Sequence, residues 1–149
     1  MNQKRILVGI PCLNERATIA QVVKDFSEVL PDARIIVLDN GSTDDSASLA
    51  RVAGAEVIAV ERPGKGQVIR RLFADMDADC WLMVDGDGTY DPGSSEKLVG
   101  AVLEGGVDMA VGRREAISDA SYRPGHALGN RLFTVSGQTR PLLTDVIDI

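Results

Sequence analysis

The sequence has very few cysteines and histidines, and it has no long apolar run. Its two cysteines, Cys12 and Cys80, lie far apart without C-x-x-C spacing, so neither a zinc site nor a disulfide framework is indicated. The one histidine, His126, has no nucleophile elbow near it, which argues against Ser-His-Asp hydrolysis. No apolar run approaches the roughly 18 residues that a membrane-spanning helix requires.

Basic residues are also scarce relative to acidic ones. The chain has 16 Lys and Arg against 22 Asp and Glu, a formal net charge of -6, which argues against broad binding of nucleic acid. An anionic substrate would therefore need a local cation or a few placed arginines. The composition, 44% hydrophobic and 26% charged, is typical of a globular protein, and the first five residues are expected to lead directly into a strand rather than to form a signal peptide. We expect one domain over residues 1–149, located in the cytoplasm.

Short apolar runs alternate with segments in which apolar residues recur at helical spacing. Strands are expected at 5–10, 34–39, 56–60, 79–85 and 107–112, and helices at 18–30, 44–52, 68–76, 95–103 and 125–135. Strand alternating with helix predicts an α/β fold, a Rossmann-like and mostly parallel sheet with helices on both faces. Phe73 and Trp81 are expected in its core. No G-x-G-x-x-G follows the first strand, which disfavours a dinucleotide-binding oxidoreductase.

Polar residues gather where the predicted strands end. They are Pro11, Asn14 and Glu15 after the first strand, Asp39 to Ser42 after the second, Gly64 to Gly66 after the third, Asp85 to Asp87 after the fourth and Gly112 with Arg113 after the fifth. Ligands of open parallel sheets bind beyond the carboxyl ends of the strands. The binding site is therefore expected at this edge.

Asp85 and Asp87 are the most informative of these residues. Two carboxylates two residues apart in a turn can face one point, and oxygen ligands suit Mg²⁺ or Mn²⁺ completed by substrate phosphate. Gly86 would let phosphates approach the backbone. An acidic turn with solvated carboxylates is the alternative reading. An EF-hand is excluded because Tyr90 stands where that loop requires glycine.

Two further strand-end residues allow both a binding role and a structural one. Asp39 could accept hydrogen bonds from a base or ribose, or it could cap the turn at Asn40. Lys65, at the start of a helix, could meet an anion together with free backbone N–H groups. Ser42 and Asp45 fit a capping-box variant and are taken as structural.

Taken in order, five segments resemble family 2 glycosyltransferases of the GT-A fold. They are Pro11-Cys-Leu-Asn14-Glu15, Val37-Leu-Asp39-Asn-Gly41-Ser42-Thr43-Asp44, Gly64-Lys65-Gly66, Asp85-Gly-Asp87-Gly-Thr89-Tyr90 and Val111-Gly112-Arg113. The segment 123–133 resembles the branch that transfers sugar to polyprenyl or dolichyl phosphate. That branch continues beyond a Thr-Asp step such as Thr144–Asp145, so the C-terminal acceptor segment is expected to be missing here.

The resemblance implies a role for each matching residue. The implied nucleotide-sugar ligands are Pro11, Asn14, Glu15, Asp39, Lys65 and Asp85, the implied metal ligands are Asp85 and Asp87, and the implied catalytic residues are Asp87, Arg113 and Arg131. Arg113 would neutralise phosphate charge, and Arg131 with His126 would hold an acceptor phosphate. Related enzymes have glutamine where this chain has Thr89, so Thr89 departs from the family's metal shell.

The implied function is inverting transfer of a hexose from a UDP- or GDP-linked sugar to a polyprenyl phosphate, with Mg²⁺ or Mn²⁺ as cofactor. Such an acceptor is already an anion and needs positioning more than a general base. A membrane surface and a second copy of the chain are further candidate partners. Transfer to a soluble acceptor, a catalytically silent nucleotide-sugar-binding module and a nucleotidyltransferase are the alternatives.

Overall fold

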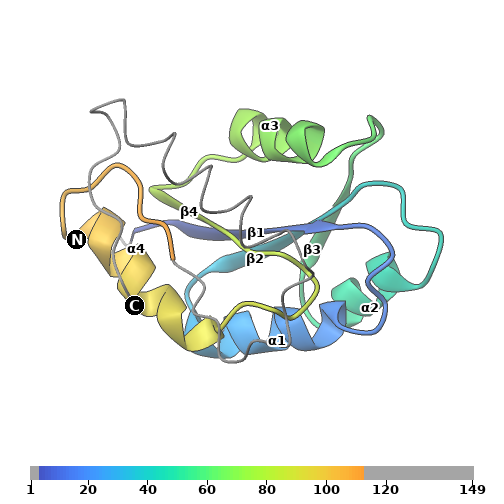
Figure 1. The fold of residues 1–149 in the computed structure, drawn as a ribbon, viewed down its shortest axis with the longest axis horizontal. Helices are drawn as coiled ribbons and strands as arrows, with labels where there is room; N and C mark the ends of the chain where they lie inside the picture. Colours follow the sequence, from blue (N-terminus) through green and yellow to red (C-terminus); the bar gives the residue numbers. More distant parts are fainter. Residues whose placement is uncertain (1–3, 113–149) are drawn as a thin grey trace, which may run out of the picture.

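The computed structural model describes residues 4–112, and within them strands and helices alternate as the sequence predicts (Figure 1). The elements in chain order are β1 (Ile6–Cys12), α1 (Ile19–Val29), β2 (Arg34–Asp39), α2 (Ser46–Val52), β3 (Glu56–Ala59), α3 (Lys65–Asp75), β4 (Cys80–Met83), the 3-10 turn η1 (Pro92–Ser94) and α4 (Ser95–Leu103).

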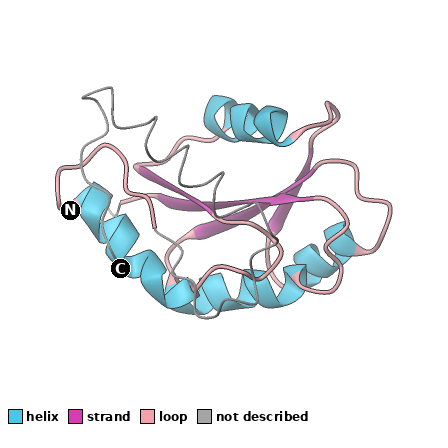
Figure 2. Cartoon of the chain, viewed as in Figure 1, coloured by secondary structure: helices cyan, strands magenta, loops and turns pink. Residues whose placement is uncertain are grey.

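The four strands form one parallel sheet in the order β3-β2-β1-β4. The central strand β1 aligns Val8 with Ile35 of β2 and with Leu82 of β4. Because all pairs are parallel, the four carboxyl ends meet at one edge of the sheet. Helices α1, α2 and α4 cover one face of the sheet and α3 covers the other (Figures 1 and 2). The predicted α/β architecture with helices on both faces is therefore confirmed.

Two apolar clusters hold these layers together. Alternate residues of a strand point to opposite faces, so Val8 and Ile10 join the cluster under α1, α2 and α4 while Leu7 joins the one under α3. Helix α3 contributes Val68 and Leu72, which are fully buried. Leu72 packs so closely on β1 that a Cβ added to Gly9 would lie 2.6 Å from its Cδ2 atom. The close fit explains a glycine in the middle of the central strand.

Three predictions about strand bounds and the core are wrong. Residues 107–112 were expected to form a strand, but no strand pairs with them among the described residues, and Met109 and Val111 are about half exposed. A strand forms only where a neighbour supplies its ladder of hydrogen bonds. The fourth strand also ends at Met83, so Asp85 lies in the following loop.

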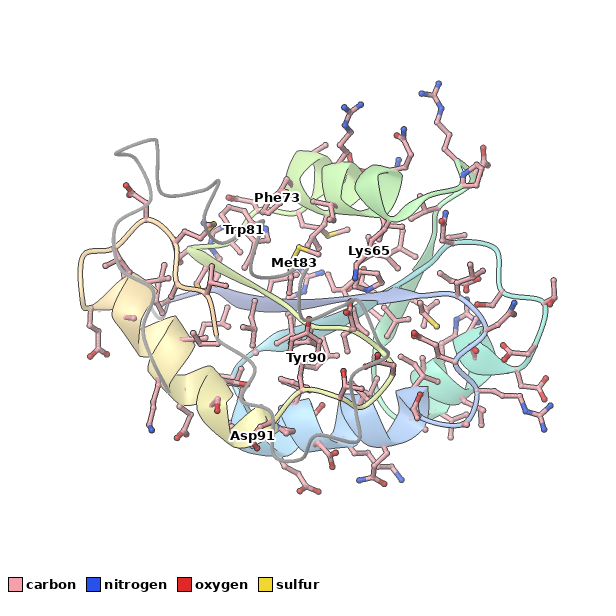
Figure 3. All side chains as sticks on the ribbon, in the orientation of Figure 1. Lys65, Phe73, Trp81, Met83, Tyr90 and Asp91 are labelled. Atoms are coloured by element: carbon pink, nitrogen blue, oxygen red, sulfur yellow. The ribbon has the colours of Figure 1, made fainter. Side chains whose placement is uncertain are left out.

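The third wrong prediction concerns Phe73, which is 52% exposed rather than in the core. Its ring meets Trp81 edge to face at a centroid distance of 5.6 Å, beside β4 (Figure 3). Phe73 directly follows Leu72, so it projects about 100° around α3 from the buried face that Val68 and Leu72 form.

The expected helix at 125–135 and the residues Arg113, His126 and Arg131 lie outside the described residues. Among residues 4–112, no helix combines the length and the apolarity that crossing a membrane requires.

Candidate functional site

The loops that follow the four strands are tied to one another at the carboxyl edge of the sheet. The backbone N–H of Asn40 donates to the Cys12 carbonyl at 2.9 Å, and that of Val60 donates to the Asp39 carbonyl at 2.8 Å. The N–H of Val84 donates to the Gly9 carbonyl at 3.2 Å. These bonds bring together the loops in which sequence analysis placed the site residues.

Asp85 lies on this edge with a cation beside it. The Lys65 ammonium, at the start of α3, donates a hydrogen bond to Asp85 Oδ1, and the Tyr90 hydroxyl donates to Oδ2 at 3.3 Å. The hydrogen bond to Asp85 raises the pKa of Lys65, so the ammonium stays charged. Lys65 and Tyr90 approach this edge from opposite sides of the sheet (Figure 3). The structure thus joins Lys65 and Asp85, which lie 20 residues apart in the sequence.

Asp87 is held by its own turn. Its Oδ1 atom accepts from the Thr89 backbone N–H at 3.0 Å and from the Thr89 hydroxyl at 2.7 Å. Thr89, where the family resemblance places glutamine, therefore orients the second carboxylate of the turn. This is a local bond of the Asx type that fixes the carboxylate direction.

Glu15 packs against the same turn from the end of β1. Its Oε2 atom is buried and has no hydrogen-bond partner among the described residues. A Cβ added to Gly86 would overlap this carboxylate, so any larger residue between Asp85 and Asp87 would have to displace Glu15. Burial raises the pKa of Glu15, and the negative charge of Asp87 raises it further.

The three carboxylates do not form a ready-made metal cage. Among residues 4–112, no group of three or more His, Cys, Asp or Glu side chains has the geometry to hold a metal ion. Mg²⁺ and Mn²⁺ do not require one, because they are often bound by one or two carboxylates and by substrate phosphate. Asp85 and Asp87 therefore fit a metal whose remaining ligands arrive with the substrate.

The residues expected around the nucleoside occupy the neighbouring loops. Asn14 has a positive φ of 57°, its N–H donates to Ser42 Oγ at 2.9 Å, and its Oδ1 accepts from the Thr43 N–H at 2.8 Å. Asp39 Oδ1 accepts from the Ser42 N–H at 3.2 Å, so it does cap the turn. Pro11 lies in β1 beside Leu38. Asn14 and Asp39 thus both hold the loop that follows β2.

Asn40 is a structural residue that sequence analysis treated only as a turn former. Its Nδ2 donates to the carbonyls of Val60 at 3.0 Å and Arg62 at 2.8 Å, and its Oδ1 accepts from the Gly64 N–H at 2.7 Å. These three bonds hold the loop that carries Lys65. A polar residue directly after a buried strand was the available signal.

The expected capping box of Ser42 and Asp45 is wrong. Asp45 precedes α2 but makes no side-chain cap, and Asp44 instead accepts from the Ser46 N–H at 2.9 Å. Ser46 is fully buried, and its hydroxyl donates to Asp44 while accepting from the Glu15 N–H at 2.8 Å. The start of α2 therefore supports the backbone of Glu15.

The two cysteines are buried, as expected of small apolar residues. Burial, followed by the negative charge of Glu15, raises the pKa of the Cys12 thiol to about 11. A thiol of this pKa carries almost no thiolate at neutral pH. Cys12 is therefore no nucleophile, although it lies at the edge that carries the acidic residues.

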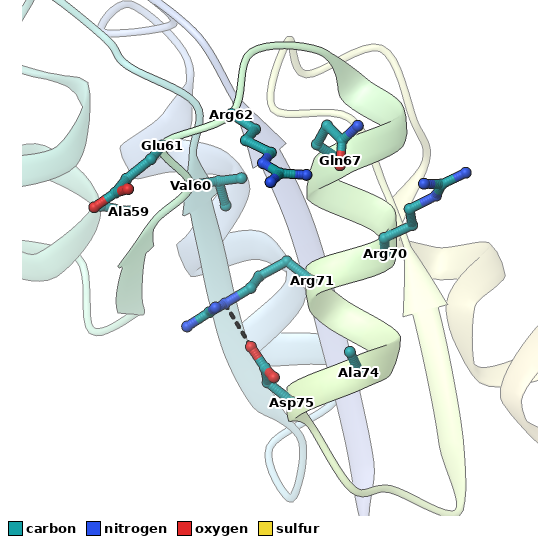
Figure 4. A pocket seen from close by; sticks show the side chains of 9 residues that line it. All are labelled: Ala59, Val60, Glu61, Arg62, Gln67, Arg70, Arg71, Ala74 and Asp75. Atoms are coloured by element: carbon teal, nitrogen blue, oxygen red, sulfur yellow. Dashed lines mark ion pairs between the residues drawn. The ribbon is translucent and has the colours of Figure 1, made fainter.

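A groove of about 460 Å³ runs between α3 and the edge strand β3 (Figure 4). Its lining includes Arg62, Arg70 and Arg71, and Arg71 pairs with Asp75 at 2.5 Å. No residue of the acidic turn lines it. Chemistry therefore favours the carboxylate edge over this groove as the functional site.

The chain matches the family model described as Glycosyl transferase family 2 over residues 7–147. It belongs to glycosyltransferase family 2. This family 2 chain is 48% identical over 122 residues to Protein RfbJ of Shigella flexneri, an alignment that covers 81% of the chain and 95% of the relative. It is 38% identical over 134 residues to Glycosyltransferase AglJ of Haloferax volcanii, covering 86% of the chain but 42% of that protein.

Solved structures extend the comparison to the fold. Glucosyl-3-phosphoglycerate synthase of Mycobacterium tuberculosis superposes with a TM-score of 0.73 and 30% identity, over 89% of this chain and 51% of that one. Its complex with Mn²⁺, UDP-glucose and phosphoglyceric acid superposes with a TM-score of 0.67 and 31% identity, over 78% of this chain and 46% of that one. The family 2 chain thus has the GT-A fold that its motifs implied, and it spans about half the length of this synthase.

Proposed function

We propose that this chain forms the donor half of a metal-dependent, inverting glycosyltransferase that transfers a hexose from a UDP- or GDP-linked sugar. The observation that carries the proposal is the acidic turn at the carboxyl edge of the sheet, where Asp85 and Asp87 lie beside Lys65. Family membership and the binding of UDP-glucose with Mn²⁺ by a structural neighbour support it.

The charges of the described site suit a diphosphate with a divalent cation. Asp85 and Asp87 would hold Mg²⁺ or Mn²⁺, and Lys65 would contact a phosphate oxygen once it leaves Asp85. The bound metal would stabilise the negative charge of the departing nucleoside diphosphate. The nucleoside would lie over the loops after β1 and β2, near Pro11, Asn14, Glu15 and Asp39, as the family resemblance implies. In a protein of net charge -6, such local cations are what an anionic donor needs.

Inversion follows if the acceptor attacks the anomeric carbon directly, opposite the leaving diphosphate. We assign Arg113 to the phosphate charge and Arg131 to the acceptor, both on sequence resemblance alone. Glu15 is not placed to act as a general base, because its Oε2 atom is buried against Gly86 of the Asp turn. An acceptor that is already an anion removes the need for one.

Two acceptors satisfy this requirement. The resemblance of segment 123–133 favours a polyprenyl or dolichyl phosphate, which would bring a cytoplasmic enzyme to a membrane surface. A small phosphorylated acceptor is the second candidate, because the structural neighbour binds phosphoglyceric acid beside UDP-glucose. A product screen with both acceptor types and each donor would separate them.

Calorimetry with UDP and GDP, with and without Mn²⁺, tests donor binding. We expect metal-dependent binding that falls at least tenfold in Asp87→Ala, since the variant loses one of two carboxylate ligands. Asp32→Asn is the matched control, because this exposed acid lies between α1 and β2, at the opposite end of β2 from the acidic turn. Binding that ignores Mn²⁺, or that survives Asp87→Ala, would refute the proposed function.

The same preparation distinguishes the remaining alternatives. A nucleotidyltransferase would release pyrophosphate from a nucleoside triphosphate, whereas a glycosyltransferase would not. A catalytically silent module would bind the donor without transferring its sugar or slowly hydrolysing it. Any sugar transfer or hydrolysis that Asp87→Ala abolishes therefore excludes the silent module.

A further inference from the structure

Thr18 stands at the N-cap of α1, but its side chain does not cap the helix. A threonine at this position ordinarily accepts a hydrogen bond from a backbone N–H in the first turn of its own helix. Here the Thr18 hydroxyl instead donates to the Gly86 carbonyl at 2.7 Å, across 68 residues of sequence. A second acceptor, the Glu15 carbonyl, lies farther away at 3.3 Å. The Thr18 hydroxyl therefore makes its shorter hydrogen bond to the acidic turn and not within α1.

The start of α1 does not depend on this hydroxyl. The backbone N–H groups of Thr18 and Ile19 both donate to the Glu15 carbonyl at 3.0 Å. Those of Gln21 and Val22 both donate to the Thr18 carbonyl at 3.0 Å. Since backbone bonds already define the first turn, loss of the hydroxyl leaves the helix its main support.

The acidic turn, in contrast, contains two glycines, and the bonds from Lys65, Tyr90 and Thr89 reach its carboxylates rather than the Gly86 carbonyl. Gly86 separates Asp85 from Asp87, and Gly88, with a φ of 76°, follows directly. Glycine accesses more backbone conformations than any other residue, so each carboxylate direction depends on what holds the turn. Thr18 touches both glycines: it bonds the Gly86 carbonyl, and its Cγ2 would lie 3.8 Å from a Cβ at Gly88.

We propose that Thr18 is a positioning residue that fixes the Gly86 peptide, and with it the relative placement of the Asp85 and Asp87 carboxylates. The effect of Thr18 on metal and nucleotide affinity rests on the proposed function. The effect of Thr18 on the conformation of the turn does not, because its hydrogen bond to Gly86 is present without a ligand.

Thr18→Val and Thr18→Ser test the proposal. Valine keeps the shape and removes the hydroxyl, whereas serine keeps the hydroxyl. Ser27→Ala is the matched control, because Ser27 in the same helix donates to the Val23 carbonyl at 2.7 Å, far along α1 from the acidic turn. Three readouts are compared for each protein: hydrogen exchange of the 84–91 amides in chelator, Mn²⁺-dependent UDP affinity, and thermal midpoint.

We expect Thr18→Val to speed exchange in 84–91 and to weaken Mn²⁺-dependent UDP binding about tenfold, the effect of one lost hydrogen bond. Thr18→Ser should restore both, and the thermal midpoint of Thr18→Val should match that of Ser27→Ala. Unchanged exchange in Thr18→Val overturns the inference, as does an equal loss in Thr18→Ser. Faster exchange throughout α1 also overturns it, because Thr18 would then only stabilise the helix.

The two proposals fail in different ways. Wild-type protein that binds no UDP with Mn²⁺ refutes the proposed function, and the exchange data still decide whether Thr18 holds the turn. Wild-type protein that binds UDP as strongly as Thr18→Val leaves the proposed function standing and overturns the positioning role.

Discussion

Gly86→Ala should destabilise the protein because the added Cβ would meet two side chains that pack on the acidic turn. The added Cβ would overlap Glu15 Oε2 and lie 3.2 Å from the Cδ1 atom of Ile19, a fully buried side chain. Inserting one methyl group into a packed site costs about 1–3 kcal/mol. Such a loss is a large part of a total stability of about 5–15 kcal/mol. We therefore expect a clear drop in the urea midpoint.

A double-mutant cycle with Glu15→Ala assigns that cost to the carboxylate. Truncating Glu15 removes the closest of the two collisions and leaves the milder contact with Ile19. More than half of the penalty should therefore disappear when Gly86→Ala is made in the Glu15→Ala protein, a coupling of about 0.5–3 kcal/mol. Urea unfolding in chelator at neutral pH measures all four proteins. Additive losses would refute the packing of Glu15 on the turn.

Two other predictions concern a titration and the core. Burial first, and the Asp87 charge second, raise the pKa of Glu15 in the folded protein. The protonated Glu15 side chain therefore contributes its full stability below the ordinary carboxyl pKa of about 4.3, and this contribution is lost as the pH rises through the pKa of Glu15 in the folded protein. In chelator, Glu15→Gln should therefore have a higher free energy of unfolding than wild type at neutral pH, and urea unfolding at a series of pH values should show this difference vanish below about pH 4. A difference that stays constant with pH would contradict the raised pKa of Glu15. Gly9→Ala should lower the free energy of unfolding in urea by about 1–3 kcal/mol, because its Cβ would lie 2.6 Å from buried Leu72. Gly100→Ala, in α4 with open space around it, should raise stability by about 0.5–1 kcal/mol, and an equal response of the two glycines would exclude the packing argument.

Hydrophobic periodicity predicts most of this fold because each element buries one continuous face. The run 34–39 is apolar at four successive positions and becomes β2, buried on both faces. The run 107–112 has three successive apolar residues at 109–111 and was also expected to be a strand, but it forms none within the described residues. Periodicity reports which side chains prefer burial, whereas a strand also requires a partner edge. That requirement depends on the whole sheet and is not encoded in six residues.

The sequence predicted which loops carry the site. The rule that ligands bind beyond the carboxyl ends of parallel strands placed Lys65 and Asp85 at one edge, and they form an ion pair there. The contacts between loops were not predictable, because they depend on backbone direction at glycines and on a positive φ at Asn14. The Thr18 to Gly86 bond is of this kind.

The ion pair between Lys65 and Asp85 shows how the site can be preorganised and still open to a donor. The two side chains are 58% and 30% exposed, so water screens their attraction, and pairs of this kind contribute about 0–1 kcal/mol. A bound divalent cation and diphosphate would give both side chains a stronger interaction, because Asp85 would bind the metal and Lys65 would bind a phosphate. The donor therefore needs to displace only a weak contact, while Asn40 holds the loop of Lys65 in place through its three hydrogen bonds. The strong restraints lie in the loops and the weak one lies on the ligand side, which is the arrangement that binding of an anionic donor requires.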